Sequence, residues 1–168
     1  MSAGTAAPAA DARQARRSRT VLLLIAVALA VIDLAVKAVA ETLLSTGATT
    51  DLGPLNIKLL YNRGVAFSLG ADLAPWVVIA ATGLIIAALT WYTISSAPSL
   101  TALSRTGAAL LLGGAIGNFI DRLDGQGVVD YLHSGWFPTF NLADVFITTG
   151  VSLFVLGTML SSQARTEK

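Results

Sequence analysis

The sequence predicts an all-α membrane protein with four transmembrane helices and a small extracytoplasmic β-hairpin or sheet that caps the region between the first two helices. Charged residues make up only 12% of the 168 residues, about half of the roughly 25% that is usual in soluble domains. The mean hydropathy is +0.70, and four long apolar stretches leave little room for a separate aqueous domain. We therefore expect one membrane domain over residues 20–164, flanked by tails at 1–19 and 165–168.

The first two helices are predicted at residues 20–40 and 73–94, each close to the roughly 20 residues that a helix needs to cross a bilayer. Only Asp33 and Lys37 interrupt the first, and they lie four positions apart on one helix face. Such charges are costly in lipid unless they face protein or each other. The second helix carries no charge, and Pro75 suits its first turn, where the missing N–H would be unpaired anyway.

The third and fourth helices are predicted at residues 100–120 and 145–164. The third has the weakest hydropathy because it includes Arg105, whose long side chain can reach the membrane interface. The fourth is free of charge, and Gly150 and Gly157 offer small surfaces for close helix packing. Four crossings place both chain ends on the same side of the membrane.

Positive charges outside the helices set the expected orientation, because short cytoplasmic segments are enriched in Lys and Arg. Seven of these residues lie on the side of the chain ends, and three lie on the opposite side. The seven are Arg13, Arg16, Arg17, Arg19, Arg105, Arg165 and Lys168, and the three are Lys58, Arg63 and Arg122. We therefore expect cytoplasmic termini and external loops at 41–72 and 121–144.

The start of the chain also resembles a cleavable secretory signal, with an Arg-rich segment, an apolar run and the small residues Ala38-Val39-Ala40. The polar pair Asp33 and Lys37 disfavours that interpretation, so we expect the first helix to be retained. Residues 1–19 are rich in Ala and Arg and lack apolar periodicity, which predicts a basic, disordered cytoplasmic tail.

Between the first two helices, one segment shows the pattern of a β-hairpin. Residues 55–61 partly alternate between apolar and polar side chains, Asn62-Arg63-Gly64 supplies turn residues, and residues 65–69 resume the apolar pattern. We expect this hairpin or sheet on the outer surface, and no other segment predicts a strand.

Composition excludes several classes of chemistry. The chain has no cysteine, which rules out disulfides, a cysteine nucleophile and thiolate metal sites. Its single histidine, His133, rules out zinc motifs that need a histidine pair. The formal net charge of +1 is too balanced for a nucleic-acid-binding surface, so we expect no nucleic-acid partner.

Polar residues on the outer side gather in three short segments at 117–122, 128–131 and 140–144. The loop between the third and fourth helices brings its ends together, because helices joined in this way are usually neighbours. Asp130 and Asp144 can thus meet although 14 residues separate them.

Two adjacent carboxylates do not both ionise easily, so such a pair holds an acid and a base at the same time. The base can activate a water for attack on a peptide carbonyl, while the acid polarises the carbonyl and then protonates the leaving amine. In the structural alternative, Asp144 caps the fourth helix and Asp130 is a solvated loop residue. Spacing alone leaves both interpretations open.

Five motifs follow one another along residues 20–160. They are Asp33-x-x-x-Lys37, Asn62-Arg63-Gly64-Val65-Ala66-Phe67-Ser68, Gly117-Asn118-Phe119-Ile120-Asp121-Arg122, Val128-Val129-Asp130-Tyr131 and Phe140-Asn141-Leu142-Ala143-Asp144. In this order they resemble the motifs of lipoprotein signal peptidases, the signal peptidase II family.

The resemblance implies a four-helix aspartic endopeptidase of the bacterial cytoplasmic (inner) membrane, with its active site near the outer face. Such an enzyme removes the signal peptide from a diacylglyceryl-modified prolipoprotein, cutting on the N-terminal side of the lipidated cysteine. It also implies that Asp130 and Asp144 are the catalytic dyad, and it implies no cofactor or metal. Membrane lipid is the other expected partner, and we expect the protein to act as a monomer.

The resemblance further assigns a polar shell that orients the substrate backbone or the dyad: Asn62, Asn118, Arg122 and Asn141. Each asparagine has a structural alternative, because Asn62 suits a turn and the other two suit helix ends. Asp121 can equally form an interfacial ion pair with Arg122.

Asp33 and Lys37 are expected to brace the bundle. Lys37 could instead activate a serine such as Ser68, but no other residue supports a Ser–Lys dyad. A small ion- or proton-coupled transporter component is the alternative function, with Asp33, Lys37 and Asp144 on an ion path. Acids that gather at the outer rim, and the lack of an internal repeat, favour hydrolysis.

Overall fold

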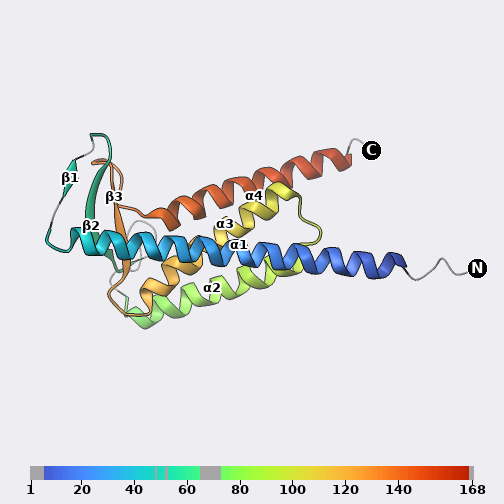
Figure 1. The fold of residues 1–168 in the computed structure, drawn as a ribbon, viewed down its shortest axis with the longest axis horizontal. Helices are drawn as coiled ribbons and strands as arrows, with labels where there is room; N and C mark the ends of the chain where they lie inside the picture. The colour runs from blue at the N-terminus through green and yellow to red at the C-terminus, as the bar shows by residue number, and fades with distance from the viewer. Residues whose placement is uncertain (1–5, 48, 52, 65–72, 167–168) are drawn as a thin grey trace, which may run out of the picture.

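The computed structural model describes residues 6–47, 49–51, 53–64 and 73–166. It contains four helices and three strands, in the order α1 (Ala6–Leu44), β1 (Thr50–Asp51), β2 (Asn56–Asn62), α2 (Pro75–Ser96), α3 (Ala102–Arg122), β3 (Val128–His133) and α4 (Leu142–Thr166). The helices form one bundle, and the strands gather at the end of the bundle that lies away from both chain termini (Figure 1).

Three of the four predicted membrane spans are confirmed as long apolar helices. Helices α1, α2 and α4 each contain a stretch long and apolar enough to cross a membrane, namely Ala10–Leu44, Pro75–Ser96 and Leu142–Gln163. Large apolar side chains such as Leu24, Leu84 and Met159 are exposed on their outer faces, where lipid can cover them. Helix α3 does not meet the same criterion, so its crossing stays a prediction.

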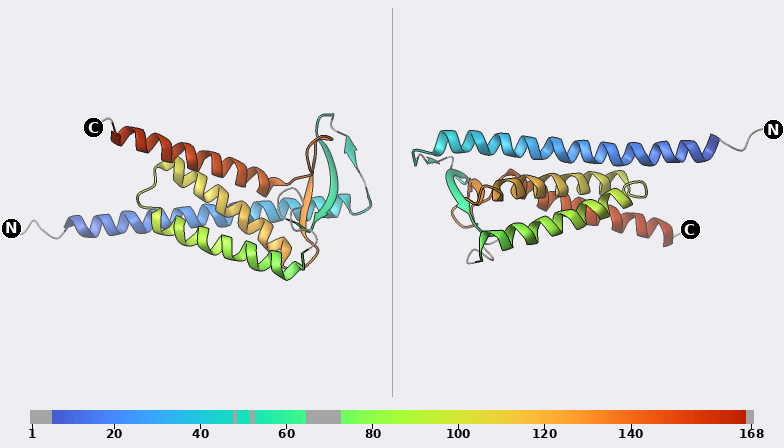
Figure 2. Two further views of the ribbon diagram at one scale, coloured as in Figure 1. Left: turned by 180° about the vertical axis from the view of Figure 1, so that it is seen from behind. Right: turned by 90° about the horizontal axis from the view of Figure 1, so that it is seen from below.

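Helix α1 is much longer than its predicted span at 20–40, because it begins at Ala6 and ends at Leu44. The predicted disordered tail at 1–19 is therefore wrong for residues 6–19, which continue the helix. Alanine and arginine dominate this segment and have high helix propensity, and adding residues to an existing helix avoids the cost of nucleation. The N-terminal part of α1 consequently projects beyond the other helices (Figure 2).

One stripe along α1 is buried against the bundle. Its members recur every three or four positions, as one face of a helix requires, and the rest of α1 is largely exposed. The stripe consists of Ser18, Leu22, Ala26, Ala30, Asp33, Lys37, Ala40 and Leu44. The predicted polar pair therefore faces the protein interior, and it lies near the strand end of α1.

Helix α3 lies at the centre and packs against the three other helices. Small residues bring its backbone close to that of α4: a Cβ atom on Gly107 would clash with the backbone at Phe154. A Cβ on Gly114 would lie 2.5 Å from the carbonyl oxygen of Ala143. These approaches bring α4 against α3 both at its first turn, by Ala143, and near its middle, by Phe154.

The strands form an antiparallel sheet in the order β1-β2-β3. Strand β2 confirms the first half of the predicted hairpin, but the second half, residues 65–69, lies outside the described residues. The expectation that no other segment forms a strand is wrong, because β3 pairs with β2 and places Asn62 opposite Val128. Its Val, Tyr and Leu side chains are typical of strands. The sheet thus joins the loop that precedes α2 to the loop that follows α3.

Candidate active site

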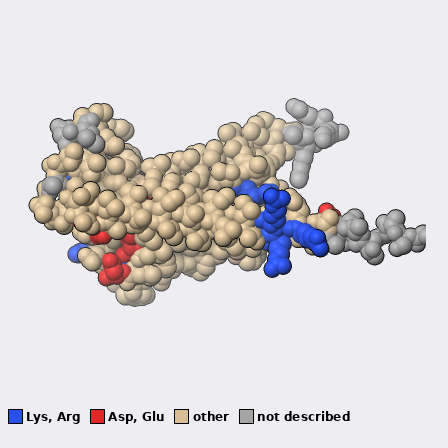
Figure 3. All heavy atoms as spheres, viewed as in Figure 1, with Lys and Arg blue, Asp and Glu red and all other residues tan. Residues whose placement is uncertain are grey.

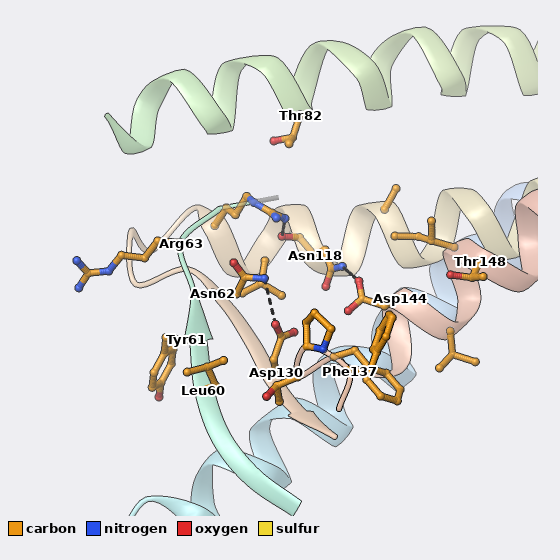
Figure 4. Close-up of a pocket in the computed structure, with 18 of the residues that line it drawn as sticks. Leu60, Tyr61, Asn62, Arg63, Thr82, Asn118, Asp130, Phe137, Asp144 and Thr148 are labelled. Atoms are coloured by element: carbon orange, nitrogen blue, oxygen red, sulfur yellow. Dashed lines mark hydrogen bonds between the residues drawn. The ribbon is translucent and has the colours of Figure 1, made fainter. Parts of the chain in front are cut away.

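A cavity of about 990 Å³ opens between strand β2, helices α2 and α3, and the beginning of α4. Most of its wall is apolar, including Ile85 and Ile86 on α2 and Ile147 on α4. The polar groups on the wall include five of the predicted site residues and Arg63. The five are Asn62, Asn118, Arg122, Asp130 and Asp144. The carboxyl groups of Asp130 and Asp144 face the same space (Figure 4).

Asp130 lies on strand β3 and is almost completely buried. Its Oδ2 atom accepts a hydrogen bond of 3.2 Å from Nδ2 of Asn62, and its Oδ1 atom accepts one of 2.7 Å from Nδ2 of Asn141. Burial and then the nearby charge of Asp144 raise the pKa of Asp130 from 3.8 to about 6, while the two amide donors lower it in part. Asp130 therefore holds a proton more readily than an ordinary aspartate.

Asp144 lies in the first turn of α4, where it forms a reciprocal cap with Asn141. The backbone N–H of Asp144 donates to Oδ1 of Asn141 at 3.0 Å, and the backbone N–H of Asn141 donates to Oδ2 of Asp144 at 3.2 Å. Nδ2 of Asn118 donates to the other oxygen, Oδ1, at 2.9 Å. The helix-cap interpretation of Asp144 is thus confirmed, and its carboxylate lines the cavity as well.

Asn141 connects the two acids. Its side chain is fully buried, and its Nδ2 atom lies within hydrogen-bond distance of Asp130 Oδ1, of the Val129 carbonyl oxygen at 3.2 Å and of Asn118 Oδ1 at 3.1 Å. Because its backbone N–H and Oδ1 bind Asp144, one residue sets the position of both carboxyl groups.

Lys37 lies in a buried polar cluster that reaches Asp144 through Asn118. Its Nζ atom is 2.7 Å from Oδ2 of Asp33, 2.8 Å from Oδ2 of Asp121 and 2.8 Å from Oδ1 of Asn118. Asp33 Oδ1 also accepts the backbone N–H of Ala143 at 2.8 Å, and Asp121 Oδ2 accepts that of Val129 at 3.1 Å. This cluster links α1 to α3, β3 and the start of α4.

Arg122 donates to backbone carbonyls at the edge of the cavity. Its two terminal nitrogens lie 2.7 Å from the carbonyl oxygen of Asn118 and 2.8 Å from that of Gly64. The predicted ion pair between Asp121 and Arg122 is not the one that forms, because Asp121 pairs with Lys37. Arg122 instead ties the end of α3 to the turn after β2.

Two features of the site had no role in the sequence-based interpretation. A Cβ atom on Gly117 would lie 2.5 Å from Oδ2 of Asp33, so glycine makes room for the buried carboxylate. The hydroxyl oxygen of Tyr131 accepts the backbone N–H of Leu142 at 3.3 Å, and burial raises its pKa to about 12. Both residues lie within motifs already noted, but their partners are distant in sequence.

The structure also bears on the alternatives. Lys37 forms ion pairs with Asp33 and Asp121 and donates a hydrogen bond to Asn118, so it does not offer a free amine as a base. Ser68 lies outside the described residues. Within the described part of the chain, no three His, Cys, Asp or Glu side chains are grouped so that they could hold a metal ion.

Comparison with known proteins identifies relatives over most of the chain. Residues 25–160 match the family described as signal peptidase (SPase) II. Lipoprotein signal peptidases of Brucella ovis and Brucella canis are each 39% identical to the chain over 139 residues, which cover 80% of this chain and 86% of the relative. A bacterial membrane enzyme solved by the in meso method at 2.3 Å resolution superposes with a TM-score of 0.75 at 29% identity, covering 89% of this chain and 93% of its own.

The raised pKa of Asp130 predicts a pH dependence of stability. Between its unperturbed value of 3.8 and its folded value of about 6, the folded chain keeps a proton that the unfolded chain has released. The stability contributed by Asp130 is therefore full below pH 3.8, falls as the pH rises to about 6 and is constant above it. Thermal unfolding in detergent should show wild type losing more stability over this window than Asp130→Asn, and parallel curves would contradict the assignment.

Proposed function

Because the chain belongs to the signal peptidase II family, the aspartic peptidases that remove signal peptides from prolipoproteins, we propose that Asp130 and Asp144 perform the hydrolysis. The observation that carries the proposal is their shared environment. Both carboxyl groups line one cavity, and both are bound by Asn141. This arrangement gives a water and a peptide carbonyl two acids to bind at once.

In this mechanism Asp130 carries the proton and Asp144 is the base. The raised pKa of Asp130 favours its protonated form, and the positive end of α4 favours negative charge on Asp144. Asp144 takes a proton from water as the water oxygen attacks the scissile carbonyl carbon, while Asp130 donates a hydrogen bond to the carbonyl oxygen. Asp130 then gives its proton to the leaving amine as the C–N bond breaks, and the dyad keeps one proton, the one that Asp144 took from water.

The cavity also fits a substrate that arrives within the membrane. Ile85, Ile86 and Ile147 form an apolar wall between α2 and α4, suited to an apolar signal helix, and the acids lie at its strand end. A diacylglyceryl group on the cysteine beside the scissile bond would remain in lipid and hold the peptide carbonyl at the depth of the dyad. We infer that diacylglyceryl modification determines which prolipoproteins are cleaved.

We further infer that α3 crosses the membrane with the other three helices and that both termini are cytoplasmic. Basic side chains gather over the N-terminal part of α1, whereas most of the acidic side chains that are visible lie at the strand end of the bundle (Figure 3). This separation agrees with the excess of positive charge in cytoplasmic segments. The dyad would then lie near the outer face of the bacterial inner membrane.

Substitution of the dyad tests its chemistry. We expect Asp130→Asn and Asp144→Asn each to abolish cleavage of a diacylglyceryl-modified prolipoprotein, because an amide can neither accept the proton of water nor share an acidic proton. Asp124→Asn is a matched control: Asp124 is an exposed loop residue whose Oδ1 atom accepts the N–H of Gln126, and asparagine can accept the same bond. Wild-type turnover in either dyad variant, inserted and folded, would show that the dyad is wrongly assigned.

The role of the lipid is tested with the substrate. We expect that replacing the substrate cysteine with serine, which prevents lipidation, nearly eliminates processing, whereas conservative changes within the apolar signal helix have modest effects. Cleavage rates of purified enzyme on lipidated and unlipidated substrate in one detergent measure this directly. Equal rates would indicate a general intramembrane protease.

The orientation is tested with reporter fusions. We expect reporters in the 95–105 link and after residue 165 to report a cytoplasmic location, and those at 45–55 and 123–127 an external one. The reason is that the segments on the side of the 95–105 link and the C-terminus carry more Lys and Arg than those on the opposite side. An external signal from the 95–105 link would contradict the proposal that α3 crosses the membrane.

A further inference from the structure

We propose that Lys37 is a positioning residue for hydrolysis, because it fixes the orientation of the Asn118 side-chain amide and keeps an N–H donor directed at Asp144. The inference rests on the proposed function of the dyad. It assigns to Lys37 a role beyond bracing the helices, although its side chain does not line the cavity.

An asparagine amide has two orientations of almost the same shape, related by exchange of its oxygen and nitrogen. In the structure, Oδ1 of Asn118 accepts from Lys37 at 2.8 Å and from Asn141 at 3.1 Å, and Nδ2 donates to Asp144 at 2.9 Å. Exchange would direct the NH₂ group at the ammonium and the oxygen at the carboxylate. All three contacts would then pair donor with donor or acceptor with acceptor.

The direction of the Lys37 ammonium group is itself fixed. Nζ forms ion pairs with Asp33 Oδ2 at 2.7 Å and Asp121 Oδ2 at 2.8 Å, and it donates a hydrogen bond to Asn118 Oδ1. The side chain is only 2% exposed, so bulk solvent does not compete for the ammonium group. The two carboxylates lie on α1 and α3, and the packed helices keep them in place.

Asn141 alone would hold the orientation of the Asn118 side-chain amide less firmly than Lys37 does. Its NH₂ group is shared among Asn118, Asp130 and the carbonyl oxygen of Val129, whereas Lys37 contributes a full positive charge. Without Lys37, the exchanged orientation of Asn118 becomes accessible whenever Asp144 carries a proton that it can donate. The base would then be held in its inactive, protonated form.

A purely structural role for Lys37 must be separated from this one. Removal of Lys37 alone leaves Asp33 and Asp121 buried without a cation, which threatens folding. Asp33→Asn provides the background in which the charge of the cluster can be matched. Asparagine keeps an oxygen to accept the N–H of Ala143, but its NH₂ group no longer accepts from Lys37. With Lys37→Met added, the cluster retains the formal charge of −1 that two carboxylates and one ammonium give the wild type.

The test is a double-mutant cycle in the Asp33→Asn background, combining Lys37→Met with Asn118→Ala. Purified variants are assayed in detergent for kcat and KM on a diacylglyceryl-modified prolipoprotein. We expect Lys37→Met to lower kcat about tenfold when Asn118 is present, with KM changed by less than about twofold. In the Asn118→Ala background the same substitution should change kcat by less than about twofold.

An equal loss of kcat in both backgrounds, or no loss in either, would overturn the proposal, because Lys37 would then not act through Asn118. Neutron diffraction on the unaltered protein supplies a test that needs no variant to fold. It should show three deuterons on Nζ of Lys37 and both amide deuterons on the Asn118 atom that faces Asp144. The exchanged amide or a neutral amine would also overturn the proposal.

These outcomes are distinct from failure of the proposed function. If Asp130→Asn and Asp144→Asn are inactive but the cycle is additive, only the role of Lys37 is wrong. If either dyad variant remains active, the proposed function itself fails.

Discussion

The strand end of the bundle, where Asp130 and Asp144 line the cavity, depends on the ion pairs of the buried Lys37 ammonium group. Each of its three partners holds a different part of the site: Asp33 binds the first turn of α4, Asp121 binds β3, and Asn118 binds Asp144. Breaking a buried ion pair by removing one partner typically costs about 3–5 kcal/mol, because the remaining charge is left without compensation. A single charged group within an apolar bundle therefore couples the two elements that carry the acids.

Close helix packing makes this cluster possible. Glycines on α3 allow it to approach both α1 and α4, and Gly117 leaves space for the carboxylate of Asp33. In lipid, apolar side chains gain little by moving inward, so van der Waals contact between small residues and polar links hold the helices together. The large apolar residues are then free to face outward, as Leu24, Leu84 and Trp91 do.

This arrangement explains which features the sequence could predict. Helices α1, α2 and α4 meet lipid on wide faces, so composition alone identifies them. Helix α3 is enclosed by the other three, so it can carry glycine, asparagine and charge that lower its hydropathy. The pairing of β2 with β3 was missed because it joins residues 66 or more positions apart. The ordered motifs indicated the acids and amides, but not which amide binds which acid, since those contacts cross between helices and strands.

The residue that begins helix α4 also positions the two cavity-lining aspartates. Asn141 begins α4 through its reciprocal bonds with Asp144, and the same side chain binds Asp130 on β3. A helix cap tolerates little movement, because its hydrogen bonds replace partners that the first turn lacks. The position of the Asp144 carboxyl group is consequently as well defined as the helix end itself. Because the Asn141 side chain also binds Asp130, one residue at the helix end sets the spacing of the two carboxyl groups.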